Sequence, residues 1–327
     1  MFLPPLAELL ASMQVIRLPL TTFFRGTKER ELVLFEGPQG WGEFAPFRDH
    51  SDEHSAMWLR AAIEAAYESW PTPVRDSIEV NAIVPSLNAK AAGEWAAKAR
   101  QDYGISTFKI KCGSANFSDD VARVESVCTA VDDISNLKIR LDVNAGWSLK
   151  DATQRIPVLQ QATKQRIEYV EQPVKSLTES ATLRESIDVK VAVDESIRLQ
   201  GGTYDEIRAA ADVAILKAIP LGGVQRSLQI AQDLDMPCIV SGSLDSSVGL
   251  SQGIALAAAL PNLAGACGLA TAQLFARDVV QQPTIAVDGK VKVGRVSPQN
   301  FEATSDSELR DYWQDRLTTC YRILESM

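Results

Sequence analysis

The sequence predicts an α/β protein, a (β/α)8-type barrel with an α+β capping domain formed by the N-terminal region and the C-terminal segment. Between residues 78 and 283, short apolar runs alternate with helical segments eight times, which is the pattern of such a barrel. Residues 1–77 combine strand-like runs with one helix, and residues 284–327 return to strand-like sequence before a final helix. We therefore expect a capping domain over 1–77, a barrel with the functional site over 78–283, and a segment over 284–327 that packs back on the capping domain.

The N-terminal region is predicted to form strands followed by a helix. Residues 15–24 and 30–36 have strand-like sequence, and a third strand begins at Trp41 after a Gly-Pro-Gln-Gly turn. Residues 51–69 form an alanine-rich helical segment that Ser51 can cap, with acidic residues in its first turn where the helix dipole favours them. Prolines at positions 71 and 73 end that helix and mark a domain boundary.

The barrel prediction rests on runs and helices that alternate in order. The predicted strands are 79–85, 107–112, 137–143, 168–171, 190–194, 213–218, 237–241 and 263–267. The clearest helices between them are 89–101, 118–131, 149–163, 223–234 and 247–260. Beyond the barrel, residues 284–287 and 291–293 are joined by Asp288-Gly289, a hairpin turn, and residues 307–324 form a closing helix.

Composition excludes several classes of function. The chain carries 33 Lys and Arg against 42 Asp and Glu, a net charge of −9, which argues against binding of nucleic acid. The sequence contains no apolar run long enough for a membrane span. The five cysteines are scattered and odd in number, which is typical of reduced thiols in a cytoplasmic protein. We expect a cytoplasmic protein that acts on a small molecule; its oligomeric state stays open.

Charged residues follow consecutive predicted barrel strands. Lys109 and Lys111 share one face of the second strand, while Asp142, Glu171 and Asp194 end the third, fourth and fifth. Lys217 ends the sixth, so that the steps from Asp142 to Lys217 are 29, 23 and 23 residues. Since the carboxyl ends of barrel strands meet at one mouth, these side chains are predicted to converge.

Three converging carboxylates indicate a metal ion. Alone they would repel one another, whereas a hard divalent cation removes the conflict, and all-oxygen ligands suit Mg²⁺, with Mn²⁺ as a substitute. The flanking lysines are placed to remove a proton next to a carboxylate and to stabilise the resulting enediolate. His50 and His54 have a spacing that could also bind a metal, but we interpret them as solvated loop residues.

Each of these residues has a simpler interpretation as a solvated or salt-bridged strand end. Six such residues in register on five consecutive units are hard to explain in that way, so we interpret the set as functional. Glu195 follows Asp194 and would point to the opposite side of a continuing strand, which favours a structural salt bridge.

The motifs resemble those of the enolase superfamily, in its muconate-lactonising subgroup. The matching order is K-x-K at 109–111, R-x-D-x-N at 140–144, E-Q-P at 171–173, D-E-S at 194–196 and a lone barrel lysine, Lys217. The segment Gly42–Pro46 also resembles the G-E-x-x-P of the capping domain, whose loops cover the active site in that family.

Within the subgroup, the chain looks most like the dehydratases of menaquinone biosynthesis. The chain is short, and Arg140 stands two residues before Asp142. The seventh strand ends in a serine-rich segment, 241–250, that runs into a helix whose free amides would suit a carboxylate. The resemblance implies Ser241, Gly242 and Ser243 as substrate contacts, together with Lys109, Arg140 and Asn144.

The resemblance implies a reaction as well. The substrate is a small anionic carboxylate, a succinyl-hydroxycyclohexadiene carboxylate, that loses water to become aromatic. Lys111 would abstract the proton and then help the hydroxyl group to leave from the same face. Lys217 would stay charged, and Mg²⁺ on Asp142, Glu171 and Asp194 would hold the enediolate.

Other functions stay open at this point. An N-acylamino acid racemase uses the same residues with Lys111 and Lys217 as opposed bases. A dipeptide epimerase usually has an Asp-x-Asp at the eighth strand, where residues 265–270 read GACGLA. A muconate cycloisomerase usually has a longer chain. A non-catalytic binding barrel is the alternative from a different class.

Overall fold

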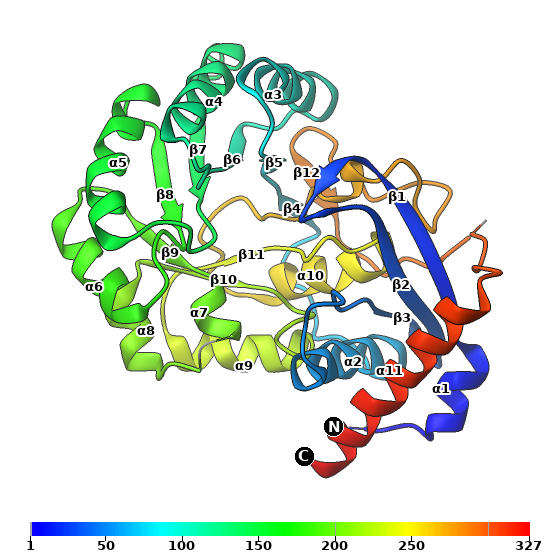
Figure 1. Ribbon diagram of the computed structural model, residues 1–327. Helices are drawn as coiled ribbons and strands as arrows, with labels where there is room; N and C mark the ends of the chain where they lie inside the picture. Colours follow the sequence, from blue (N-terminus) through cyan, green and yellow to red (C-terminus); the bar gives the residue numbers. More distant parts are fainter. Residues whose placement is uncertain (1, 200, 300) are drawn as a thin grey trace.

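A parallel sheet that curls into a barrel forms the centre of the molecule (Figure 1). The computed structural model describes residues 2–199, 201–299 and 301–327. The sheet runs in chain order from β5 to β11. Its strands are β5 (Ala82–Val84), β6 (Thr107–Lys111), β7 (Lys138–Asp142), β8 (Ile167–Glu171), β9 (Val191–Val193), β10 (Val213–Leu216) and β11 (Cys238–Val240).

The predicted eighth strand closes the ring through single bridges. Leu263 and Gly268 form parallel bridges to Cys238 and Ser241 at the β11 side, and Cys267 bridges to Val80 at the side of the first strand. The amide of Asn81 donates to the carbonyl oxygen of Cys267 at 2.8 Å. The prediction of a (β/α)8-type barrel is therefore confirmed.

The barrel helices begin where the sequence supplies capping side chains. Asn88 accepts a hydrogen bond from the amide of Ala91 at the start of α3, and Ser148 accepts one from Asp151 at the start of α5. Helix α3 ends at Gly104, whose φ of 67° is the left-handed conformation that glycine adopts without strain. The helices are α3 (Ala89–Tyr103), α4 (Phe117–Ala130), α5 (Leu149–Ala162), α6 (Leu177–Ser186), α7 (Glu195–Arg198), α8 (Tyr204–Ala210), α9 (Val224–Leu234) and α10 (Ser247–Ala259).

The capping domain has its own apolar core beside the barrel. An antiparallel sheet of β1 (Gln14–Phe24), β2 (Thr27–Gly37) and β3 (Gly40–Phe44) packs against α2 (Asp52–Tyr67), with α1 (Leu6–Ser12) at one end. Ser51 caps α2 as predicted. Gly42 lies where β3 packs closely against α2. A larger residue would not fit there, because a Cβ at this position would collide with the carbonyl oxygen of Ala62.

The C-terminal segment divides between the two cores. Strand β12 (Lys290–Lys292) pairs antiparallel with β4 (Ser77–Glu79) in a separate two-stranded sheet just before the first barrel strand, so the predicted hairpin region does not join the sheet of the capping domain. Helix α11 (Ser307–Ser326) does lie against α2, as Figure 1 shows. Residues 284–327 therefore do not pack as one unit on the capping domain. The domain boundaries at 77 and 283 stay a prediction.

Within the described residues, no helix is both long and apolar enough to cross a bilayer.

A short 3-10 helix (Ala272–Leu274) follows the eighth strand, and Leu274 belongs to the core of the capping domain.

The indole of Trp313 anchors α11 in the capping core, so its removal should destabilise the protein. Trp313 is fully buried, packs edge-on against Phe44 at 5.8 Å, and donates to Glu31 at 3.1 Å. We expect Trp313→Ala to lower the free energy of unfolding by about 3–5 kcal/mol. Exposed Gln314 is the control. Gln314→Ala should change the free energy of unfolding by less than about 0.5 kcal/mol, with both variants measured by urea titration.

Candidate active site

A pocket of about 640 Å³ lies at the carboxyl ends of the barrel strands and is shared by both domains. The capping domain contributes Phe24, Arg25 and Phe47, while β5 contributes Ile83. From the rest of the barrel come Lys109, Lys111, Asp142, Asn144, Lys217 and Ser241–Ser243. The structure therefore places most of the sequence-predicted site residues at one cavity.

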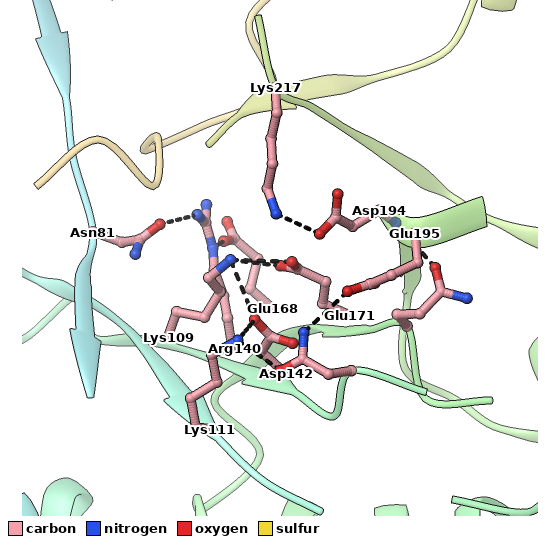
Figure 2. A network of polar contacts seen from close by, with 12 residues as sticks. Asn81, Lys109, Lys111, Arg140, Asp142, Glu168, Glu171, Asp194, Glu195 and Lys217 are labelled. Carbon is pink, nitrogen blue, oxygen red and sulfur yellow. Dashed lines mark hydrogen bonds and ion pairs between the residues drawn. The ribbon is translucent and has the colours of Figure 1, made fainter. Parts of the chain in front are cut away.

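Strand register brings the charged side chains together. Lys111 on β6 pairs in register with Asp142 on β7, and Asp142 with Glu171 on β8. Asp194 follows the end of β9, and Lys217 follows the end of β10. Figure 2 shows these side chains pointing toward one another at the centre of the barrel mouth.

Each carboxylate of this cluster pairs with at least one cation. The ammonium of Lys109 lies 2.9 Å from Glu171 and 3.6 Å from Asp142, and that of Lys111 lies 2.7 Å from Asp142. The Lys217 ammonium donates to Asp194 Oδ2 at 2.5 Å. Lys111 also donates to Asn144 at 2.7 Å, so this amide oxygen orients the lysine.

Burial and charge set the ionisation of the cluster. Burial, together with the charges of Asp142 and Asp194 on either side, raises the pKa of Glu171 to about 7. Burial alone would raise the pKa of Asp194 too, but Lys217 and Arg198 outweigh it and hold that pKa below its usual range. Burial would likewise lower the pKa of Lys109, yet Glu171 and Asp142 raise it overall and keep this ammonium charged.

The donor set suits a hard divalent cation. Asp142, Glu171 and Asp194 offer carboxylate oxygens from neighbouring strand ends, and the buried Oδ1 of Asp142 has no hydrogen-bond partner among the described residues. The three side chains are turned to ammonium groups, and the described part of the chain holds no ready-made cluster of three acidic, histidine or cysteine ligands. A cation held by these three carboxylates would take the place of their ammonium contacts.

Comparison with known proteins places this site in a family. The models for an enolase N-terminal domain-like region and an enolase C-terminal domain-like region match residues 15–66 and 91–298. An o-succinylbenzoate synthase of Mycolicibacterium smegmatis is 41% identical over 98% of both chains. The chain belongs to the o-succinylbenzoate synthase family of the enolase superfamily.

Solved structures agree on the fold. The muconate lactonizing enzyme from Pseudomonas fluorescens superposes with a TM-score of 0.73 at 20% identity, covering 92% of this chain and 97% of that one. A dipeptide epimerase from Enterococcus faecalis, complexed with Mg and a dipeptide, gives a TM-score of 0.70 at 19% identity over 88% and 97% of the two chains. At these identities the likeness concerns the fold alone.

In this member of the o-succinylbenzoate synthase family, Arg140 does not reach the pocket. It shares a face of β7 with Asp142 but lies two residues, about 6–7 Å, deeper in the barrel. Its guanidinium is fully buried, donates to Asn81 at 2.8 Å and to Glu168 at 2.6 Å, and stacks on Tyr169. The prediction of Arg140 as a substrate contact is wrong. Its long side chain places the guanidinium beside Glu168, near the start of β8 and away from the pocket at the carboxyl ends of the strands.

The helix after the serine-rich segment also differs from expectation. The amides of Ser246 and Gly249, at the start of α10, donate to the Glu43 carboxylate at 3.2 Å, and the amide of Ser247 donates to Asp278 at 3.1 Å. These amides are therefore not free for a substrate carboxylate. Two carboxylates of the chain itself occupy the helix N-terminus instead.

The loop amides before that helix are engaged as well. Ser241 and Gly242 donate to the carbonyl oxygens of Leu216 and Gly268 at 2.9 Å. The Ser243 amide donates to Asp245 Oδ2 at 2.7 Å. These three residues line the pocket, but their backbone amides cannot bind a substrate carboxylate in this conformation.

Sequence reasoning missed two side chains that hold the site in place. Arg198, one turn into α7, contacts Asp194 Oδ1 at 3.0 Å and Glu195 at 3.2 Å. The buried amide oxygen of Gln172 accepts from the Asp194 amide at 3.1 Å. The i, i+4 spacing of Asp194 and Arg198 could have indicated the first contact, but only if the strand was known to turn into a helix there.

Glu195 behaves as predicted in part. Its carboxylate forms the expected salt bridge, to Arg198, yet it also accepts from Asn144 at 3.2 Å and lines the pocket. The strand ends at Val193, so the alternation argument no longer applies and Glu195 turns to the same side as the cluster.

The interpretation of the histidines as solvated loop residues is right only in part: His50 does lie in a loop but is half-buried, and His54 lies in a helix. His50 packs against the rings of Phe47 and Trp58, and burial together with the nearby charge of Arg25 lowers its pKa to about 4. His54 lies inside α2, with its ring centroid 6.5 Å from that of His50. His50 is thus a half-buried side chain that is neutral at pH 7.

The buried pairs of Lys109 make a stability prediction. Lys109→Met would leave Glu171 and Asp142 buried with one cation fewer, so we expect a loss of about 3–5 kcal/mol in the free energy of unfolding. Adding Glu171→Gln should restore part of that loss, because it removes a stranded charge. Exposed Lys138, paired with Glu168 at 2.7 Å, is the control, and Lys138→Met should cost at most about 1 kcal/mol. An equal loss in both single variants would contradict the buried-pair account.

Proposed function

We propose that this protein is an o-succinylbenzoate synthase, a hydro-lyase of menaquinone biosynthesis in the cytoplasm. It would convert 2-succinyl-6-hydroxy-2,4-cyclohexadiene-1-carboxylate to o-succinylbenzoate by syn-elimination of water. The observation that carries the proposal is 41% identity over 98% of both chains to a relative of that name. Lysine residues and carboxylates at the barrel mouth supply the groups that the elimination needs.

Lys111 is the proposed base. Its side chain is 21% exposed and lines the pocket, whereas Lys109 is nearly buried between two carboxylates. Lys111 Nζ would take the proton from the carbon next to the ring carboxylate. The same ammonium would then give a proton to the departing hydroxyl group on that face, so that water leaves and the ring becomes aromatic.

Lys217 is the proposed electrostatic partner. It follows β10, four strands from β6 in the ring, so its ammonium approaches the pocket from the side opposite to Lys111. Held 2.5 Å from Asp194, it would stay charged and stabilise the enediolate that forms when the proton is lost. Lys109 would add positive charge near the substrate carboxylate.

Asp142, Glu171 and Asp194 would hold Mg²⁺, with Mn²⁺ as a substitute. When bound, the ion supplies positive charge beside the carboxylate oxygens on which negative charge develops. Asp142, Glu171, Asp194 and Glu195 are balanced by Lys109, Lys111, Lys217 and Arg198. With Lys111 neutral, as a base must be before it takes the proton, a divalent cation would leave this set with a net positive charge of +1, which favours an anionic substrate.

A racemase is the second candidate, because Lys111 and Lys217 face the pocket from opposite sides. Racemisation needs both amines to exchange protons, one on each face of the carbon, whereas syn-elimination needs one. A dipeptide epimerase is less favoured, since residues 265–270 lack the Asp-x-Asp of that group.

Metal dependence can be measured without turnover. We expect calorimetry to detect Mg²⁺ binding to the wild type and a loss of at least tenfold in affinity in Asp142→Asn, Glu171→Gln and Asp194→Asn. Glu168→Gln is the matched control, because the Glu168 carboxylate pairs with Lys138 and Arg140 and not with the lysines of the cluster, and this variant should bind Mg²⁺ normally. Full activity after exhaustive chelation would overturn the three-carboxylate assignment.

The two lysine roles predict different outcomes for arginine substitutions. Arginine keeps the charge but stays protonated near neutral pH, so Lys111→Arg should abolish dehydration, followed as loss of the diene absorbance. Lys217→Arg should retain more activity, reduced by the misplacement of a bulkier group. Any racemisation, followed by deuterium incorporation, should fall in both variants. Dehydration that survives in Lys111→Arg and disappears in Lys217→Arg would reverse the assignment.

A further inference from the structure

A buried carboxylate of the capping domain is bound by the barrel. Glu43, at the end of β3, is fully buried and accepts hydrogen bonds from the amides of Ser246 and Gly249 at 3.2 Å and from the Ser246 hydroxyl group. Burial and the neighbouring charge of Asp245 raise its pKa to about 7. A carboxylate in this position has a high desolvation cost, which the donors at the helix N-terminus offset.

The residues around Glu43 connect it to the pocket wall. Asp245 accepts from the Ser243 amide at 2.7 Å, and Arg30 donates from Nε to the Leu244 carbonyl oxygen at 3.1 Å. Ser243 and Leu244 both line the pocket. Arg30 also stacks at 4.0 Å on Phe47, which lines the pocket from the capping side.

The start of α10 is shaped to receive this carboxylate. A Cβ at position 249 would lie 2.7 Å from Glu43 Oε1 and 2.9 Å from Asp245 Cβ, so only glycine fits without a shift. Leu244 has a φ of 65°, an uncommon conformation for a residue with a branched side chain. Contacts to Arg30 and the Glu43–α10 junction therefore hold the loop in a conformation that it would rarely adopt alone.

We propose that Glu43 is a positioning residue for substrate binding: by tying β3 to the start of α10, it sets the pocket wall formed by Ser241–Leu244. The inference rests on the proposed function, because substrate affinity is what it explains. Glu43 does not line the pocket itself, so it acts through the loop and not by touching the substrate.

A second carboxylate of the capping domain provides a matched comparison. Glu64 on α2 accepts from the amides of Val224 and Gln225, at 2.5 Å and 3.3 Å, at the start of α9. It is buried like Glu43 and joins the same two domains. Residues 223–225, which it contacts, do not line the substrate pocket. Both residues should support stability, but only Glu43 should affect substrate affinity.

The experiment compares Glu43→Ala, Glu43→Gln and Glu64→Ala for Tm, kcat, KM and calorimetric binding of o-succinylbenzoate. We expect both alanine variants to lower Tm. We expect Glu43→Ala to raise KM and weaken product binding about tenfold, more than it lowers kcat, which is the scale of a lost buried hydrogen-bonded charge. Glu43→Gln, which keeps one acceptor oxygen, should recover most of the affinity, and Glu64→Ala should keep the wild-type KM.

Gly249→Ala tests the same junction from the barrel side. The added methyl group should displace Glu43 and raise KM by a similar factor, and the double variant with Glu43→Ala should be no worse than the single variants. Equal KM values in wild type, Glu43→Ala and Gly249→Ala would overturn the inference. Wild-type protein without dehydratase activity would instead overturn the proposed function, so the two failures can be told apart.

Discussion

Charge balance among buried groups at the barrel mouth constrains the rest of this structure. Carboxylates at three neighbouring strand ends would repel one another, and the lysines of β6 and β10 and the arginine of α7 hold them together. The same strand ends place Lys111, Asp142 and Lys217 in the lining of the pocket. The apolar, tightly packed strands around the site raise the cost of burying these charges, and their pairing offsets that cost.

The capping domain completes the site through polar contacts that reach barrel helices. Glu43 and Glu64 bind the N-terminal turns of α10 and α9, and Arg30 and Arg60 bind the carbonyl oxygens of Leu244 and Gly222. These charged groups give direction as well as stability, because a backbone N–H donates, and a carbonyl oxygen accepts, along a defined direction. These contacts define the position of the capping domain relative to the barrel mouth. They thereby also position the residues that the capping domain contributes to the pocket wall.

Some sequence predictions held because they depend on local chemistry. The spacing of Asp142, Glu171, Asp194 and Lys217 follows the repeat of one strand and one helix, and strand alternation puts Lys109 and Lys111 on one face. Ser51 begins α2 because its hydroxyl group satisfies a helix amide, a contact within one turn of chain. Such features involve neighbours in the sequence, and so the sequence indicates them directly.

Other predictions failed where distant segments compete for the same group. Arg140 shares a strand face with Asp142, but its depth and its partners Asn81 and Glu168 are decided by packing across the barrel. The amides of α10 looked free because Glu43 and Asp278 are 203 and 31 residues away from their partners. Likewise, β12 pairs with β4, and no pattern within either segment predicts this pairing.

The sequence alone determined the barrel, its order of strands and the groups that meet at its mouth, because regular alternation and repeat length are local properties of the chain. Only the tertiary structure decided which of those groups face the pocket, which helix amides are occupied and where the capping domain sits. Each of these depends on hydrogen bonds and packing between residues far apart in the chain. The spacing of residues along the sequence does not show which of them come into contact.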